Sequence, residues 1–242
     1  MKAVVLCAGR GIRLLPYTQE VPKCLLKVGP KTLLEYIIES FTAAGIEEIW
    51  LVTGFQEEKI KTLVKVRDYP HIKTVTNPYY LKTNTAFSLN LALKHIDDDF
   101  ILINGDVIFD RRILFDLLNY GKKNCVVVDN SIKLDKEEVK VIAQNGFISR
   151  IGKALEPSEC KGEAIGINKI SRDTILPLSK EFDLLEQKGE KNHFFEKGFD
   201  ILAHKSCPFG ILLTNKPWTE IDTQEDFDYA KKEIYTKLHH KQ

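Results

Sequence analysis

The stretch AVVLCAGRGIRLLPYTQEVPK, residues 3–23, joins a short apolar run directly to a glycine-containing loop. Its first six residues are continuously apolar, as expected of a strand buried on both faces of a parallel sheet. Gly9 and Gly11 follow at once, and such glycines let the backbone approach a ligand and turn N–H groups toward phosphate oxygens. Arg13 and Lys23 add positive charge. The stretch therefore predicts a strand followed by a triphosphate-binding loop.

Two better-known phosphate-binding loops do not fit this spacing. A P-loop ends in Gly-Lys-Ser or Gly-Lys-Thr, and that ending is absent. A dinucleotide fingerprint needs a third glycine at position 14, where this chain has Leu14. The loop therefore indicates a different kind of nucleotide-binding protein.

Beyond the loop, β-branched runs alternate with amphipathic stretches, which is typical of βαβ units and a mainly parallel sheet. The first half predicts strands at 48–53, 74–76 and 100–103 and helices at 33–41, 57–65 and 83–93. The second half predicts strands at 124–129, 140–143, 146–151 and 163–170, a hairpin at Asn145-Gly146 and a terminal helix at about 222–237. No repeat or linker interrupts the pattern. We therefore expect one α/β domain over 1–242, with a mixed, mostly parallel twisted sheet flanked by helices.

The composition of the chain limits the kinds of molecule that it is expected to bind. The 242 residues carry 35 Lys plus Arg and 34 Asp plus Glu, a net charge of +1, so no bulk field attracts the chain to nucleic acid or an anionic membrane. Five scattered cysteines without C-x-x-C spacing favour buried reduced thiols over a zinc site. The apolar run at 3–8 is too short for a signal sequence or a membrane span, so we expect a cytoplasmic protein. Apolar surface patches cannot be read from a sequence, so a monomer and a homo-oligomer both stay open.

The pattern Gly-x-Gly-x-Arg-Leu-x-Pro-x-Thr-x-x-x-Pro-Lys at 9–23 closely resembles the opening motif of the sugar-phosphate nucleotidyltransferases. Three later segments extend the resemblance over nearly the whole chain: FILINGDVIF at 100–109, RIGK at 150–153 and WTEIDT at 218–223. The last two, with NTAFSL at 84–89, look more like the cytidylyltransferase branch, which includes phosphocholine, aminoethylphosphonate and inositol-1-phosphate cytidylyltransferases. The resemblance implies a Rossmann-like nucleotidyltransferase fold and a reaction that uses CTP and Mg²⁺.

The resemblance also implies catalytic and metal-binding roles. Lys23 neutralises charge at the α-phosphate, and Arg13 binds the β- and γ-phosphates that leave as pyrophosphate. Asp106 and Asp222 bind Mg²⁺, because hard oxygen ligands in small number suit this ion. Glu220 stands two residues before Asp222 and points the same way on an extended segment, so it is a reserve ligand.

The remaining assignments concern the nucleotide and the acceptor. Lys153 holds the phosphate of the acceptor, and Glu163 accepts hydrogen bonds from hydroxyls of the acceptor or pairs with an ammonium group. Asn84 lines the base pocket, and it equally fits the cap of the helix that begins there. The residues expected to contact the nucleotide are Leu6, Ala8, Gly9, Gly11, Arg13, Lys23, Asn84 and Asp106.

Simpler interpretations stay open for single residues. A strand-end Asp such as Asp106 is more often a turn or cap residue than a metal ligand, and a single Lys such as Lys153 is usually a solvated charge. Cys7 lies inside an apolar strand with no base that would stabilise a thiolate, which argues against a nucleophile.

These features predict an enzyme that transfers CMP from CTP to a phosphorylated small alcohol, giving a CDP-alcohol and pyrophosphate. The segment 138–153 resembles the inositol-1-phosphate enzymes of thermophiles, so myo-inositol 1-phosphate, giving CDP-inositol, is the leading acceptor. Phosphocholine and aminoethylphosphonate come next. One alternative is a uridylyl- or thymidylyltransferase acting on a sugar 1-phosphate. Another is a catalytically inactive, nucleotide-binding regulatory subunit, although Arg13, Lys23, Asp106 and Asp222 are all present.

Overall fold

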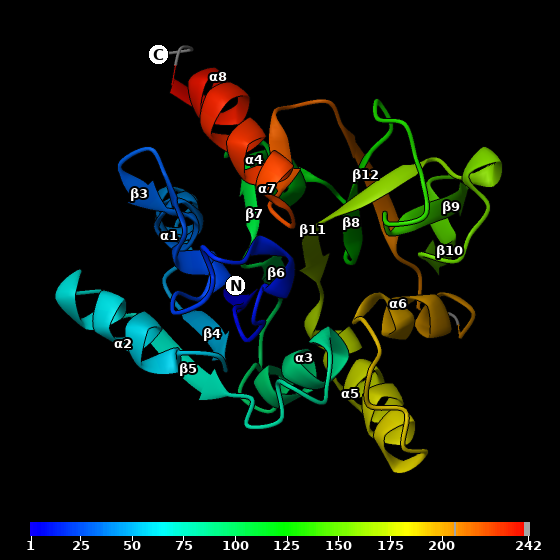
Figure 1. The fold of residues 1–242 in the computed structure, drawn as a ribbon. Helices are drawn as coiled ribbons and strands as arrows, with labels where there is room; N and C mark the ends of the chain where they lie inside the picture. Colours follow the sequence, from blue (N-terminus) through cyan, green and yellow to red (C-terminus); the bar gives the residue numbers. More distant parts are fainter. Residues whose placement is uncertain (206, 240–242) are drawn as a thin grey trace.

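The computed structural model describes residues 1–205 and 207–239, and in this part of the chain a nine-stranded mixed sheet forms the centre of the molecule (Figure 1). The strands lie in the order β5 (Ile72–Thr76), β4 (Ile49–Thr53), β1 (Lys2–Leu6), β6 (Phe100–Asn104), β11 (Gly162–Ile170), β8 (Cys125–Asp129), β12 (Gly210–Thr214), β10 (Phe147–Gly152) and β9 (Lys140–Gln144). The α/β class and the mixed sheet are confirmed. The sequence missed the five-residue strand β12.

Parallel pairing is confined to part of this sheet. Strands β5, β4, β1 and β6 are mutually parallel, and β12 is parallel to β8. Strand β11 is antiparallel to β6, β8 and β9, and β9 and β10 form the hairpin predicted at Asn145-Gly146. The prediction of a mostly parallel sheet is therefore wrong for the second half, where a hairpin and the long antiparallel strand β11 replace βα crossovers.

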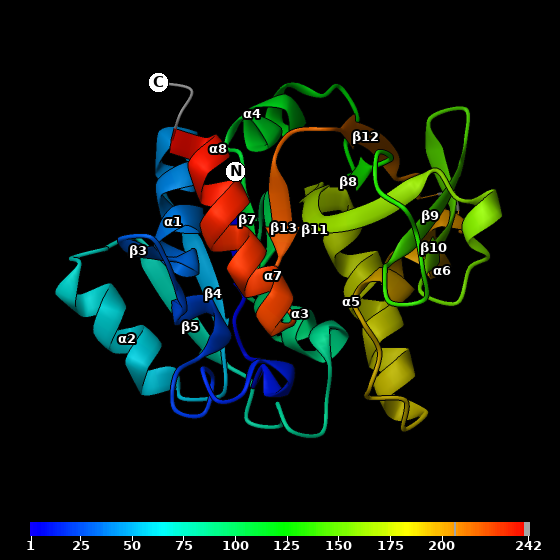
Figure 2. The same ribbon diagram turned by 45° about the horizontal axis from the view of Figure 1, so that its top comes forward.

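Helices cover both faces of the sheet, as the second view shows (Figure 2). Along β1, Ala3 and Val5 face a core shared with α1 (Leu33–Ala43), α2 (Glu57–Val66) and α4 (Arg112–Asn119). Val4 and Leu6 face the opposite core, shared with α3 (Thr85–Leu93), α5 (Arg172–Gln187) and α6 (Glu196–Ala203). This two-sided burial explains the continuous apolar run, because alternate side chains of a strand point to opposite faces.

The long segment between β1 and α1 is not structureless. It contains 3₁₀ turns at Ile12–Leu14 and Lys23–Leu25 and a small hairpin of β2 (Lys27–Val28) and β3 (Lys31–Thr32). Its buried Leu14 and Val28 form a third core with the C-terminal segment. That segment, predicted as one helix at about 222–237, is α7 (Gln224–Tyr229), a π-helical stretch (Ala230–Ile234) and α8 (Tyr235–His239).

A two-stranded ladder joins the middle of the chain to this C-terminal segment. Strand β7 (Val107–Phe109) pairs antiparallel with β13 (Trp218–Glu220), and the Ile221 N–H donates to the Asp106 carbonyl at 3.0 Å. Residues flanking the ladder, Asp106 and Asp222, are thereby brought together although 116 positions separate them in the chain.

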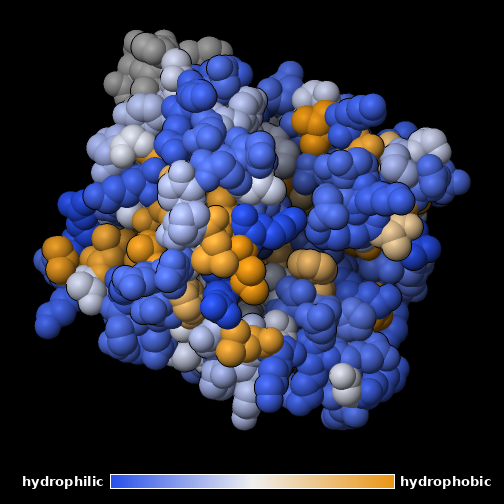
Figure 3. Space-filling model, in the orientation of Figure 1, coloured by the Kyte–Doolittle hydropathy of each residue, from blue (hydrophilic) through white to orange (hydrophobic). Residues whose placement is uncertain are grey.

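Two expectations from the sequence concern the state of the cysteines and the lack of a membrane-spanning helix. All five cysteines are free, and three of them are buried, whereas Cys160 and Cys207 are half-buried. Across residues 1–205 and 207–239, no helix is both long and apolar enough to cross a bilayer. On the face shown in Figure 3, hydrophobic side chains gather over the middle, and the region over β9 and β10 is largely hydrophilic.

Candidate active site

A cavity of about 500 Å³ opens at the carboxyl ends of β1 and β6. These two strands end side by side, with Leu6 opposite Asn104 and the Gly105 N–H donating to the Leu6 carbonyl at 3.0 Å. A Cβ atom on Gly105 would lie 2.7 Å from that carbonyl oxygen, so only glycine allows the close approach. The cavity therefore lies in the crevice where α/β sheets usually bind ligands.

The glycine loop forms one rim of this cavity. Gly9 lines it with open space around its Cα, whereas Gly11 has a φ of 64° and does not line the cavity. A Cβ on Gly11 would come within 3.2 Å of Thr18, whose buried hydroxyl donates to the Gly11 carbonyl at 2.6 Å. The glycine and threonine of the motif thus fix the shape of the loop, which explains part of the spacing of the motif.

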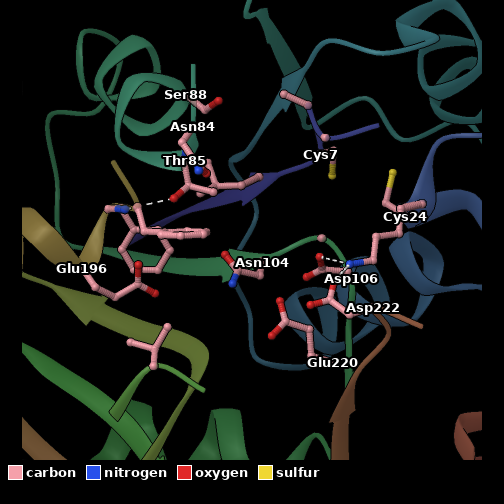
Figure 4. Close-up of a pocket in the computed structure, with 18 of the residues that line it drawn as sticks. Cys7, Cys24, Asn84, Thr85, Ser88, Asn104, Asp106, Glu196, Glu220 and Asp222 are labelled. Atoms are coloured by element: carbon pink, nitrogen blue, oxygen red, sulfur yellow. Dashed lines mark hydrogen bonds and ion pairs between the residues drawn. The ribbon is translucent and has the colours of Figure 1, made fainter. Parts of the chain in front are cut away.

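Three carboxylates meet at the floor of the cavity (Figure 4). Asp106, Glu220 and Asp222 each offer an oxygen within 4.8 Å of the others. The Oδ1 atom of Asp106 is buried and has no hydrogen-bond partner among the described residues. An orphaned buried oxygen beside two further carboxylates suits a hard divalent cation, so these residues fit the predicted magnesium site.

Lys23 lies among these carboxylates. Its Nζ donates to Asp106 Oδ2 at 2.7 Å and also pairs with Asp222. Burial lowers the pKa of Lys23, but the charges of Asp106, Asp222 and Glu220 outweigh burial and raise it above its usual value. Lys23 is therefore a fixed positive charge at every physiological pH.

Arg13 makes a second cationic contact with the cluster, at 2.5 Å from Asp222, and its side chain is half exposed. Burial raises the pKa of Asp222, but Lys23 and Arg13 lower it below its usual value. The pKa of Glu220 is shifted in the opposite direction, because burial and the charges of Asp106 and Asp222 hold it well above the usual range. Positive charge that enters the cluster would therefore favour the ionised form of Glu220.

The wall of the cavity beside β1 and α3 carries small and amide side chains. Leu6 and Ala8 line it from the end of β1, and Asn84, Thr85 and Ser88 line it from α3. The Asn84 side chain accepts the Thr85 N–H at 2.8 Å and caps α3. The two interpretations of Asn84 are thus compatible in this structure, since a helix cap also faces the cavity.

The predicted acceptor residues line the part of the cavity that includes Phe194. Lys153 lies with its Nζ 5.0 Å from the centre of the Phe194 ring. Burial and the charges of Glu138 and Asp129 raise the pKa of Glu163 to about 8. Glu196 also lines this part of the cavity. The sequence analysis did not predict it, although a glutamate that directly follows Phe194-Phe195 and begins an apolar helix face is a signal of burial.

Comparison with known proteins identifies the family. Residues 3–161 match the MobA-like NTP transferase domain. The chain belongs to this family. The MobA-like match ends before Glu163, so Glu196, Glu220 and Asp222 lie outside the matched range although they share the cavity with Lys23 and Asp106.

Two relatives and one solved structure resemble this MobA-like protein over most of its length. The CTP:phosphoglutamine cytidylyltransferase of Campylobacter jejuni is 28% identical, over 94% of this chain and 98% of its own. The bifunctional IPC transferase and DIPP synthase of Aquifex aeolicus is 30% identical over 95% of this chain, which spans about half (51%) of that relative. The CTP:phosphocholine cytidylyltransferase LicC of Streptococcus pneumoniae shares the fold with a TM-score of 0.81, at 23% identity, covering 95% of this chain and 97% of its own.

Two cysteines of the MobA-like domain lie at the cavity. Cys7 and Cys24 both line the cavity, but a hydrogen bond to Cys24 and burial raise the pKa of Cys7 well above its usual value. A thiol held in the neutral form is a poor nucleophile. The structure thus supports the prediction that Cys7 has no nucleophilic role.

Glu196 makes the stability of this MobA-like protein depend on pH. Burial raises its pKa from 4.5 to about 7, so the folded state holds a proton that the unfolded state has lost over this range. Stability should therefore fall by up to about 3 kcal/mol between pH 4.5 and 7. We expect Glu196→Gln to remove this loss, so that the variant matches the wild type near pH 5 and exceeds it near pH 8.

Urea unfolding of the wild type and the variant at these two pH values measures the effect. Glu39→Gln is the control, because Glu39 is half exposed and pairs with Lys31 outside the cavity. An equal stability difference between Glu196→Gln and the wild type at both pH values would show that Glu196 is not a desolvated carboxyl group.

Proposed function

We propose that this nucleotidyltransferase moves CMP from CTP to a small phosphorylated alcohol and releases pyrophosphate. The observation that carries the proposal is the meeting of Lys23, Asp106 and Asp222 in one cavity at the carboxyl ends of β1 and β6. The choice of CTP is supported by the Campylobacter relative, which aligns with 94% of this chain and whose name states CTP as its substrate.

The reaction is an in-line displacement. A phosphate oxygen of the acceptor attacks the α-phosphorus of CTP, the new P–O bond forms, and the bond to the departing pyrophosphate breaks. Two anions must approach one another, so positive charge and positioning supply most of the catalysis. The attacking phosphate is already ionised at neutral pH, so no general base is needed.

Each cationic side chain has a place in this displacement. Lys23, buried at the floor, offsets charge on the α-phosphate, and Arg13, nearer the rim, meets the β- and γ-phosphates. Lys153, which lines the same cavity, holds the acceptor phosphate. Asp106 and Asp222, with Glu220 in reserve, would hold Mg²⁺, which neutralises triphosphate charge when bound.

The acceptor is the least constrained part of the proposal. The sequence favours myo-inositol 1-phosphate, followed by phosphocholine and aminoethylphosphonate. The Campylobacter relative is named for phosphoglutamine, which adds an acceptor derived from an amino acid to the set to be tested. A uridylyl- or thymidylyltransferase acting on a sugar 1-phosphate stays the alternative enzyme.

Pyrophosphate release tests the proposal directly. CTP, UTP, dTTP and ATP are each combined with Mg²⁺ and with myo-inositol 1-phosphate, phosphocholine, aminoethylphosphonate, phosphoglutamine and glucose 1-phosphate. We expect turnover with CTP to exceed that with UTP or dTTP by at least about tenfold, which is about 1.4 kcal/mol of discrimination. Turnover only with UTP or dTTP and glucose 1-phosphate would support the alternative enzyme. Absence of turnover with every pair, together with CTP binding, would support an inactive regulatory subunit.

A further inference from the structure

The carboxyl group of Glu196 is buried in the wall of the cavity and lacks a hydrogen-bond partner among the described residues for one of its oxygens. The residue is 5% exposed, and its Oε2 atom is buried without a hydrogen-bond partner in the described part of the chain. Figure 4 shows Glu196 on the far side of Asn104 from the cluster of Asp106, Glu220 and Asp222. Its carboxyl group therefore lies apart from the cluster of three carboxylates.

The surrounding fold holds Glu196 in place. It begins helix α6, and the preceding Phe195 N–H donates to the Thr85 hydroxyl at 2.9 Å. Two residues further, a Cβ on Gly198 would lie 2.5 Å from Leu178, so α6 is packed closely against α5. A carboxylate on so tightly packed a helix start cannot turn out to solvent without disturbing the core, which makes its burial a fixed feature of the site.

The cavity as a whole is rich in negative charge. Eight acidic and three basic side chains line it among the described residues. Two of the basic ones, Lys23 and Arg13, already pair with the metal-binding cluster. Lys153 is the remaining one, and its charge acts on Glu163 and Glu196 as well as on Asp222. One lysine, which the acceptor phosphate also requires, cannot neutralise both Glu163 and Glu196.

We propose that Glu196, with Glu163 as a second carboxyl group, binds a primary ammonium group of the acceptor, so that the substrate is a phosphorylated amino alcohol or a similar aminoalkyl phosphate. This inference rests on the proposed function. A buried carboxylate requires both a hydrogen-bond donor and a positive charge. A primary ammonium supplies both, the hydroxyls of a polyol supply only donors, and a quaternary ammonium supplies only charge.

The acceptor proposed here, an aminoalkyl phosphate, differs from the acceptor that the sequence favours, myo-inositol 1-phosphate. The segment behind that preference, 138–153, contributes Glu138, Val139 and Lys153 to the cavity. Glu196 lies outside the segment, so its chemistry is independent of the resemblance.

A matched pair of acceptors tests the inference. The acceptors 2-aminoethyl phosphate and 2-hydroxyethyl phosphate have the same size and differ in one charged group. With CTP and Mg²⁺, we expect kcat/KM of the wild type to be at least about 30-fold higher for the amine, as expected for a buried charge pair. In Glu196→Gln, which keeps the shape but loses the charge, this ratio should fall about 30-fold, mainly through KM for the amine. Glu39→Gln, outside the cavity, should keep the wild-type ratio.

Binding supplies a readout that does not depend on turnover. Calorimetry of each acceptor with protein loaded with a non-hydrolysable CTP analogue should show the same preference and its loss in Glu196→Gln. Equal kcat/KM for the two acceptors, or for phosphocholine and 2-aminoethyl phosphate, would overturn the ammonium site and leave cytidylyl transfer intact. Absence of turnover with any acceptor would overturn the proposed function, and amine binding that depends on Glu196 would still support the site.

Discussion

Replacing Asp106 by asparagine is expected to lower kcat for pyrophosphate release on the order of 100- to 1000-fold while the protein stays folded. The substitution keeps the shape of the side chain, and its amide oxygen still accepts a hydrogen bond from Lys23, which now donates to Asp106 Oδ2 at 2.7 Å. It removes one negative charge from the three carboxylates that lie within 4.8 Å of one another. Loss of such a metal ligand removes several kcal/mol of transition-state charge stabilisation.

The matched control is Asp116→Asn. Asp116 is an exposed residue of α4, lies outside the cavity and pairs with Lys216. Activity is measured as pyrophosphate release over a range of Mg²⁺ concentrations, and folding by thermal unfolding. If Asp106→Asn kept near-normal kcat at saturating Mg²⁺, the carboxylate cluster would not be the metal site.

The pattern of apolar residues along short segments made the N-terminal half of the fold predictable. The continuous apolar runs that became β1 and β6 are buried on both faces, and each ends at a polar or glycine residue that opens the cavity. Because the carboxyl ends of parallel strands meet at one edge, the position of Asp106 after β6 was itself a signal of function. Strand β12 and the ladder of β7 with β13 were missed because runs of three to five residues have little periodicity.

Long-range proximity was not predictable from local pattern. Lys23 and Asp222 form an ion pair although 199 positions separate them, and only the family resemblance placed both in one site. Glu196 was missed for a related reason. Its burial comes from the packing of α6 against α5 and β10, and no spacing rule connects these elements in the sequence. The resemblance pointed to the residues proposed to bind phosphate and metal, whereas the burial of Glu196 depends on packing that no motif describes.

Replacing Lys23 by methionine is expected to affect both activity and stability. Turnover should fall on the order of 100- to 1000-fold, because the charge that offsets the α-phosphate is lost. Without divalent cations near pH 8, the variant should also lose about 2 kcal/mol, or roughly 4–8 °C in Tm, since three clustered carboxylates keep only Arg13 as a counterion. Their pKa values are then raised in the folded state, so this loss should shrink as the pH falls and the carboxylates take up protons.

The effect of Mg²⁺ on Tm distinguishes a Lys23 that neutralises the carboxylates from a Lys23 that only packs beside them. In the wild type, Lys23 occupies the same carboxylates that Mg²⁺ would bind, so the ion must compete with an internal cation. In Lys23→Met this competitor is absent, and Mg²⁺ should raise Tm more than it does in the wild type. Lys59→Met is the control, because Lys59 is exposed, lies outside the cavity and donates to a backbone carbonyl of Glu20. A Lys23→Met variant whose Tm is insensitive to both pH and Mg²⁺ would mean that the lysine packs beside the cluster without neutralising it.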